Sequence, residues 1–275
     1  MIYNTIKAYI HENASKGLSQ KTIEQRTYCL YKFASWCERN GLTDLSILTL
    51  NHLNQYQTWL NTQPLQNKTI RTLLLDVRLF FNWCENSYLI FDNPAATWDL
   101  GPQPPYRLPD VLTETEMNSL LSIPDPLTKL GIRDKAILEI LYSTGIRRQE
   151  LKGLNVKDIN FDQGIVLVKK GKGTNQRLVP IGQSALYWTK AYLDSTQKRF
   201  QHRHSRLVLN QMGKPVGLGV LQRIFILNKE KARISKRGCC HLIRHTMATH
   251  LHKNGADIRV IQEILGHKKI DTTLI

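Results

Sequence analysis

The stretch HLIRHTMATHLHKNGADIRVIQEILGH, residues 241–267, predicts two consecutive helices near the end of the chain. Its apolar residues recur at helical spacing, as at Ile243, Met247 and Leu251. We therefore expect one helix over 242–253 and a second over 258–265. Gly266 is a typical C-terminal cap for the second helix. This part of the chain is helical, and polar or basic residues stand where each helix begins or ends.

The start of the first of these helices is a candidate anion site. His241 and Arg244 are three residues apart and share a helix face. A helix start also presents free N–H groups and the positive end of the helix dipole, which suit a phosphate. His241 and His245 have the spacing of a zinc helix, but Leu242 stands where a metalloprotease motif has its glutamate base. The residues alone equally allow a core histidine and a surface ion pair made by Arg244.

Two upstream stretches place basic residues at turns. In TGIRRQEL (144–151), a helix ends at Gly145, Arg147 follows in the turn, and Glu150 is close enough to hold its guanidinium. The stretch GIVLVKKGKGTNQRLVPI (164–181) predicts a β-hairpin with strands over 165–168 and 177–181. Lys172 stands between two glycines at its tip. Taken singly, these residues also fit a surface ion pair and a solvated turn.

The composition favours a partner with negative charge. The 275 residues include 38 Lys and Arg against 22 Asp and Glu, a formal charge of +16. Nucleic acid is the commonest polyanion, and the basic residues are spread too evenly for a membrane-surface helix. No stretch approaches the roughly 20 apolar residues that span a bilayer. The odd number of cysteines, five, predicts reduced thiols and a cytoplasmic protein.

The order of helix signals predicts two modules. Residues 1–94 read as a bundle of about four helices, including one that begins after Ser19 and stops at Asn40. Residues 95–112 are expected to be a linker, because five of the ten prolines lie within 93–112. The second module, 113–275, opens with a capping box from Thr113 to Glu116. The predicted fold class is mainly α with a small antiparallel β-sheet.

The order of these motifs resembles the tyrosine recombinase (phage integrase-like) family, and within it the Xer-type and integron-type recombinases. The matching stretches are STGIRRQEL, VKKGKGTNQRLVPI, LNQMGKPV, HLIRHTMATHLHKNGADIRVIQEILGH and KKIDTTLI. They cover residues 113–275 in order, whereas the N-terminal bundle resembles the family's core-binding domain more weakly. The resemblance implies an α+β catalytic domain that acts on double-stranded DNA without a metal or other cofactor and without a small-molecule substrate.

The resemblance implies a role for each candidate catalytic residue. Arg147 and Arg244 would bind the scissile phosphate, and Lys172 would protonate the leaving 5′ oxygen. His241 would take part in proton transfer around the nucleophile, and His267 would hydrogen-bond a phosphate oxygen. Five basic residues are candidate DNA contacts, although an ordinary solvated surface explains any single one equally well: Lys21, Arg26, Lys68, Arg71 and Arg177.

The family's nucleophile is a tyrosine in a pattern like TTxIY, a few residues after the Gly-His pair. Here DTTLI stops at Ile275, so the expected tyrosine would be the next residue. We expect a truncation, which would leave the chain inactive. A decayed element and a nucleophile supplied by a neighbouring subunit are the alternatives.

The expected function is site-specific recombination or integration of DNA through a 3′-phosphotyrosine, by a homotetramer that a missing C-terminal tail would weaken. Three rival classes stay open at this point. They are a DNA-binding protein without catalysis, a type IB topoisomerase-like enzyme, and a metal-dependent nuclease. The nuclease is disfavoured because the sequence has no paired-carboxylate motif for Mg²⁺.

Overall fold

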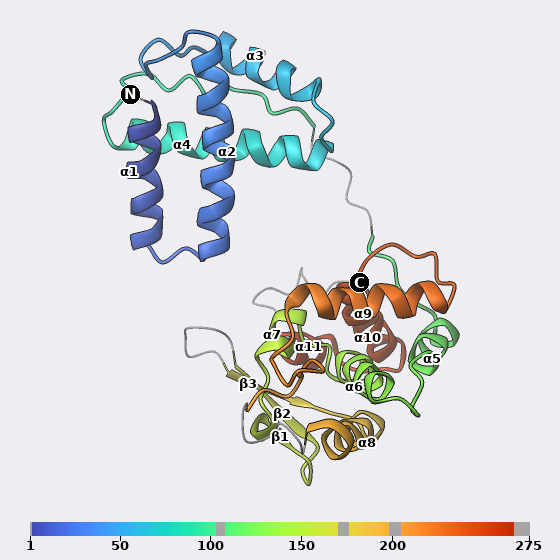
Figure 1. The fold of residues 1–275 in the computed structure, drawn as a ribbon. Helices are drawn as coiled ribbons and strands as arrows, with labels where there is room; N and C mark the ends of the chain where they lie inside the picture. The colour runs from blue at the N-terminus through green and yellow to red at the C-terminus, as the bar shows by residue number, and fades with distance from the viewer. Residues whose placement is uncertain (1, 103–107, 170–175, 198–204, 267–275) are drawn as a thin grey trace. The chain divides into compact units, whose positions relative to one another are not determined.

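The computed structural model of the chain describes residues 2–102, 108–169, 176–197 and 205–266. The chain divides into two compact units, Met1–Tyr106 and Arg107–Ile275, which are called unit 1 and unit 2 below. Both units are mainly helical, and the sheet belongs to unit 2 (Figure 1). This agrees with the expected fold class. None of the helices in the described ranges is long and apolar enough to cross a lipid bilayer.

Unit 1 is a helical bundle. Its helices are α1 (Ile2–Ser15), α2 (Gln20–Arg39), α3 (Leu50–Asn61) and α4 (Asn67–Asn86). Helix α2 begins and ends where the cap signals predict, since the Ser19 side chain accepts a hydrogen bond from the Thr22 N–H and Asn40 is the C-cap. The bundle core is rich in aromatic rings. Phe33 of α2 packs edge-on against Tyr56 of α3 and Phe81 of α4, so one side chain joins three helices.

The range expected to be a linker contributes to both cores. Ala95, Trp98 and Leu100 are buried among the helices of unit 1, and the Trp98 side chain is almost fully enclosed. Leu112 is buried in the core of unit 2. Prolines indicate that a segment is not helical, but they do not indicate whether its apolar side chains are buried or exposed to solvent. The part of this range without a place in either core is therefore shorter than the proline pattern indicates.

Unit 2 packs helices around a three-stranded antiparallel sheet of order β1-β2-β3 (Figure 1). Its helices are α5 (Glu114–Ser122), α6 (Lys129–Thr144), α7 (Arg148–Gly153), α8 (Gln183–Tyr192), α9 (Leu218–Lys231), α10 (Cys240–Lys253) and α11 (Ile258–Leu265). The short elements are a 3-10 turn η1 (Val156–Asp158), a π turn η2 (Leu193–Gln197), and strands β1 (Ile159–Asn160), β2 (Ile165–Lys169) and β3 (Gln176–Pro180). The hairpin β2–β3 forms as the sequence predicts, with Val168 paired to Arg177. The two-residue strand β1 is too short to show an alternating pattern, so the hydrophobic periodicity does not predict it.

Helix α6 lies at the centre of unit 2 and is buried on most of its surface, with α8 and α10 packed against it. The capping box at Thr113 is present as predicted. Two helices end at glycines in the left-handed conformation, α6 at Gly145 (φ 57°) and α11 at Gly266 (φ 62°). These two helix ends matter for the site, because their last carbonyl groups point to the same arginine.

Candidate active site

Two arginines and the end of α11 meet at one main-chain oxygen. Arg147 precedes α7, and Arg244 is the fifth residue of α10. The Arg244 Nη2 donates to the Leu265 carbonyl over 2.5 Å, and the Arg147 Nη1 donates to the same oxygen over 3.4 Å. The Arg244 Nη1 also donates to the Gly145 carbonyl over 2.5 Å. The fold therefore brings together two cations that are 97 positions apart in the chain.

Arg244 is buried, with 5% of its surface exposed. Burial lowers its pKa to about 9, and the positive charge of Arg147 adds to the decrease. The side chain is still a cation at neutral pH. Its two carbonyl partners lie at or just beyond the last turns of α6 and α11, where main-chain oxygens lack helical partners and carry partial negative charge. These oxygens compensate the buried charge without supplying a full negative charge.

Glu150 of α7 holds the Arg147 side of the site. Its carboxylate accepts hydrogen bonds from the Arg147 main-chain N–H (2.7 Å) and, more weakly, from Arg147 Nη1 (3.4 Å). It also accepts two from the Arg177 guanidinium, over 2.8 and 2.9 Å. Burial by itself would raise the pKa of Glu150, but the hydrogen bonds from Arg177 and Arg147 outweigh it and lower the pKa. Glu150 is therefore ionised at neutral pH.

His241 lies on the first turn of α10, where the sequence predicts it, and its side chain is exposed. Protein atoms around part of its ring lower its pKa, and the charges of Arg244, Arg148 and Arg147 lower it further. The imidazole is consequently neutral at pH 7 and can accept a proton. His245 lies one turn further along α10. Burial lowers its pKa, and the charges of His241 and Arg244 lower it further.

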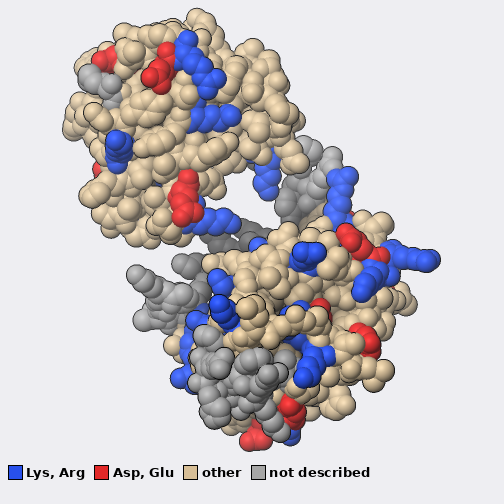
Figure 2. All heavy atoms as spheres, in the orientation of Figure 1, with Lys and Arg blue, Asp and Glu red and all other residues tan. Residues whose placement is uncertain are grey.

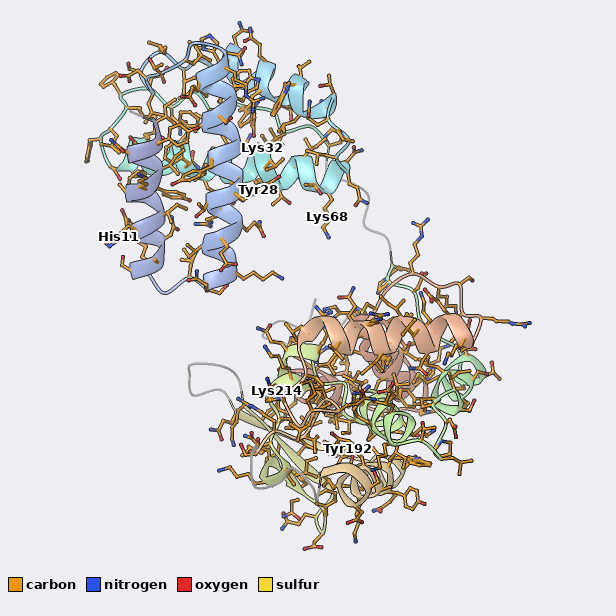
Figure 3. All side chains as sticks on the ribbon, viewed as in Figure 1. His11, Tyr28, Lys32, Lys68, Tyr192 and Lys214 are labelled. Carbon is orange, nitrogen blue, oxygen red and sulfur yellow. The ribbon has the colours of Figure 1, made fainter. Side chains whose placement is uncertain are left out.

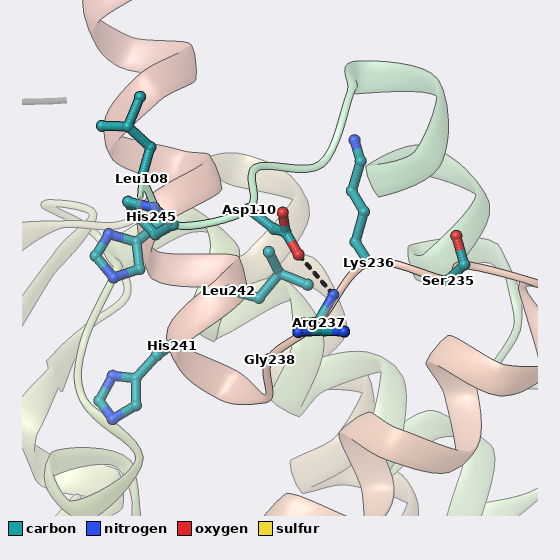
Figure 4. A pocket seen from close by; sticks show the side chains of 10 residues that line it. Leu108, Asp110, Ser235, Lys236, Arg237, Gly238, His241, Leu242 and His245 are labelled. Atoms are coloured by element: carbon teal, nitrogen blue, oxygen red, sulfur yellow. Dashed lines mark hydrogen bonds between the residues drawn. The ribbon is translucent and has the colours of Figure 1, made fainter. Parts of the chain in front are cut away.

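A cavity of about 740 Å³ opens beside this helix start. Figure 4 shows His241 and His245 of α10 on one side of it and the segment around Arg237 on another. The main-chain N–H of Arg237 donates to the Asp110 carboxylate over 2.7 Å, which ties that segment to the start of unit 2. Lys236, which also lines the cavity, is paired with Glu116 over 2.6 Å, so the groups left to bind an anion are Arg237 and the two histidines.

The predicted DNA contacts lie in different surroundings. Lys21 and Lys68 are exposed, and Lys68 extends away from the start of α4 (Figure 3). Arg26 is turned inward, where its Nη1 donates to the Asn13 side chain over 2.5 Å. Arg71 donates to the Gly101 carbonyl over 2.7 Å. Arg177 is bound to Glu150, with 13% of its side chain exposed. Hydrophobic patterns cannot distinguish these cases, because each arginine occupies an ordinary helix or strand position.

Lysine and arginine side chains are visible on both units in Figure 2, and several lie close together on unit 2. Lys172 and His267, two of the five candidate catalytic residues, lie outside the described residues, so their positions stay predictions. Within the described ranges, no three His, Cys, Asp or Glu side chains gather in a way that could hold a metal ion. The sequence reasoning missed the carbonyls of Gly145 and Leu265, which every residue possesses and no motif marks.

The sequence of this chain matches a known protein family. Residues 110–275 match the model of the phage integrase family. The chain is 36% identical to tyrosine recombinase XerC 2 of Ralstonia nicotianae, over 94% of this chain and 77% of that protein. It is 33% identical to tyrosine recombinase XerD of Vibrio cholerae, over 94% of this chain and 86% of that protein.

Solved structures share the fold at lower sequence identity. The XerH recombinase bound to its difH substrate superposes with a TM-score of 0.76 at 20% identity, covering 98% of this chain and 80% of that one. A lambda integrase (75–356) dimer bound to a COC′ core site gives a TM-score of 0.76 at 18% identity, covering 98% and 96%. The family match and the Xer relatives together show that the chain belongs to the phage integrase family of tyrosine recombinases, which break and rejoin DNA.

Proposed function

We propose that this protein binds double-stranded DNA and recombines it at specific sites by metal-free cleavage and rejoining through a 3′-phosphotyrosine. One observation carries the proposal most directly. The guanidinium groups of Arg147 and Arg244 converge on a single oxygen, that of Leu265, with His241 on the same helix start as Arg244. Two fixed cations next to a neutral imidazole suit a phosphodiester that gains negative charge during attack.

Each residue then has a distinct task. Arg147 and Arg244 bind the non-bridging oxygens of the scissile phosphate through charge-assisted hydrogen bonds. Neutral His241 accepts the proton of the attacking hydroxyl or hydrogen-bonds the phosphate, which its lowered pKa allows at pH 7. Lys172 protonates the leaving 5′ oxygen and His267 binds a phosphate oxygen, roles that rest on the family resemblance alone.

DNA is the partner that the charge and the relatives favour. The formal charge of +16 suits a polyanion, and both XerH and lambda integrase were solved on DNA. We propose phosphate contacts for exposed Lys21 and Lys68, and a homotetramer on DNA. The five cysteines are free thiols, which agrees with a reaction in the cytoplasm.

The nucleophile that the resemblance requires is a tyrosine next after Ile275. The test therefore uses two proteins, the 275-residue chain and a form extended by tyrosine and the residues encoded downstream in the source DNA. Each is incubated in EDTA with a nicked suicide substrate that carries the end of the source element, and covalent protein–DNA is measured on a denaturing gel. Trapping must depend on the added tyrosine, and Arg147→Ala and Arg244→Ala must abolish it.

Arg259→Ala is the matched control, because Arg259 is an exposed arginine of α11 outside the candidate active site. It should trap DNA at the rate of the extended protein. Binding without any covalent product in the extended form would replace the proposal with a DNA-binding protein that lacks catalysis. Cleavage that EDTA abolishes would indicate a metal-dependent nuclease instead.

A further inference from the structure

Arg177 uses its guanidinium to connect two elements of the candidate active site. Its Nη1 and Nη2 donate to the two oxygens of Glu150 over 2.8 and 2.9 Å, and its Nε donates to the Ile264 carbonyl over 2.7 Å. The side chain starts from β3, where Arg177 pairs with Val168, next to the last pair of the β2–β3 ladder, Lys169 with Gln176. One planar group therefore joins the hairpin, α7 and α11.

The hydrogen bonds between Arg177 and Glu150 determine how strongly Glu150 binds the Arg147 guanidinium. Glu150 is 8% exposed at its side chain and is shared between the two arginines, with the shorter side-chain contacts going to Arg177. Its contact to the Arg147 guanidinium is long, 3.4 Å. If Arg177 were absent, the buried carboxylate would turn to Arg147 for compensation, because an unpaired buried charge is costly. The Arg147 guanidinium would then be drawn away from a phosphate.

The bond to Ile264 controls the end of α11. The carbonyl of Ile264 is taken by Arg177, and the next carbonyl, that of Leu265, is taken by Arg244 and Arg147. Gly266 lies directly against the same guanidinium, since a Cβ built there would be 3.2 Å from three Arg177 atoms. Arg177 thus fixes the main chain at the C-terminal end of α11, next to Leu265 and Gly266.

We infer that Arg177 is a positioning residue, which holds Glu150 and the end of α11 so that Arg147 and the Leu265 carbonyl keep the geometry for the scissile phosphate. This inference rests on the proposed function. It differs from the sequence-based hypothesis that Arg177 contacts DNA. Lysine cannot take over the role, because an ammonium group is a point charge that cannot bond both carboxylate oxygens and a carbonyl in one plane.

The experiment measures single-turnover covalent attachment by the tyrosine-extended protein at increasing DNA concentration. The variants are Arg177→Gln, Arg177→Lys, Glu150→Gln and the Arg177→Gln/Glu150→Gln pair, with Arg259→Ala as control. We expect both Arg177 variants to lower the maximal rate about 100-fold, the scale of an ångström misplacement, while half-saturating DNA changes less than about 2-fold. The double variant should be clearly faster than the product of the two single effects predicts, because Arg177 acts in part through Glu150 and in part through Ile264.

The pH dependence supplies a second readout. The Arg177 hydrogen bonds help to lower the pKa of Glu150, so their loss raises it. The part of the acid limb that belongs to Glu150 should therefore move to higher pH in Arg177→Lys and be absent in Glu150→Gln, where only the limb from protonation of His241 remains. A general loss of stability would not move this limb. If Arg177→Gln fails to give a native circular dichroism spectrum, the inference is tested with Arg177→Lys, which keeps the positive charge.

Three results would overturn the inference. They are a full maximal rate in Arg177→Lys, weaker DNA binding at an unchanged maximal rate, and a double variant that shows the product of the two single effects. The second of these would restore the DNA-contact hypothesis. Failure of the proposed function is recognised separately, since the extended protein with Arg177 intact would then give no covalent product.

Discussion

Replacing Gly145 with alanine tests whether the end of α6 is as tightly packed as the structure shows. Gly145 has φ 57°, and a Cβ built there would lie 1.9 Å from the Met247 Cε and 3.1 Å from the Leu265 Cδ2. Alanine in this backbone conformation costs about 1–2 kcal/mol. The nearest atom, Met247 Cε, is the end of a flexible side chain that can shift, so packing adds only about 1 kcal/mol, the low end of the cost of overfilling a core. We therefore expect Gly145→Ala to destabilise unit 2 by roughly 2–3 kcal/mol.

Gly255→Ala is the matched control for the backbone part of this cost. Gly255 has φ 86°, and a Cβ built there meets no heavy atom within 4 Å. Gly255→Ala should lower the free energy of unfolding only by the backbone contribution, about 1–2 kcal/mol. In a Met247→Ala background the packing contribution of Gly145→Ala should largely disappear, because the contact at Met247 is removed.

The free energy of unfolding is measured by denaturant titration with amide hydrogen exchange in α6 and α10 as the probe. These helices belong to unit 2, so the result is separate from the stability of unit 1. Gly145→Ala should also slow covalent trapping in the extended protein, since the Gly145 carbonyl binds Arg244 and Leu265 binds both arginines. A Gly145→Ala cost no larger than that of Gly255→Ala would refute the packing argument.

Three further outcomes are expected. The Lys21→Ala/Lys68→Ala pair should reduce the slope of log affinity against log salt by about 2, since each phosphate contact contributes about 0.9, and an unchanged slope would remove both from the interface. NMR should show His241 titrating with a pKa below the ordinary histidine value of about 6.5, and this pKa should rise in Arg148→Gln, because the Arg148 charge contributes to lowering it. Protonation of His241 favours the unfolded chain, so the protein loses stability as the pH falls from about 6.5 towards the folded-state pKa. Trp98→Ala should cost unit 1 about 3–5 kcal/mol in calorimetry, whereas a linker residue would cost almost nothing.

The family of this protein and the roles of its site residues rest on different observations. Belonging to the phage integrase family follows from sequence similarity over nearly the whole chain. The assignment of catalytic work to Arg147, Arg244 and His241 is a proposal supported by their convergence. The trapping experiment addresses it with variants of single residues.

The sequence by itself determined several helix ends and the order in which the motifs follow one another, whereas the start of α10 at Cys240 lies two residues before the predicted one. The caps at Ser19 and Thr113 and the glycines at 145 and 266 act within a few residues, so local rules suffice to locate them. The hairpin was equally readable from its alternating strands and glycine turn. The order of basic motifs along the chain was enough to suggest the family.

Only the tertiary structure decided what each arginine contacts. Arg177 and Ile264 are 87 positions apart and Arg147 and Leu265 are 118 apart, so no local pattern could link them. The oxygens that organise the site are main-chain carbonyls, identical in every residue and selected only by where a helix happens to end. Burial of Trp98 in unit 1 has the same cause. An apolar side chain beside prolines enters a core only if another segment of the chain leaves space for it there.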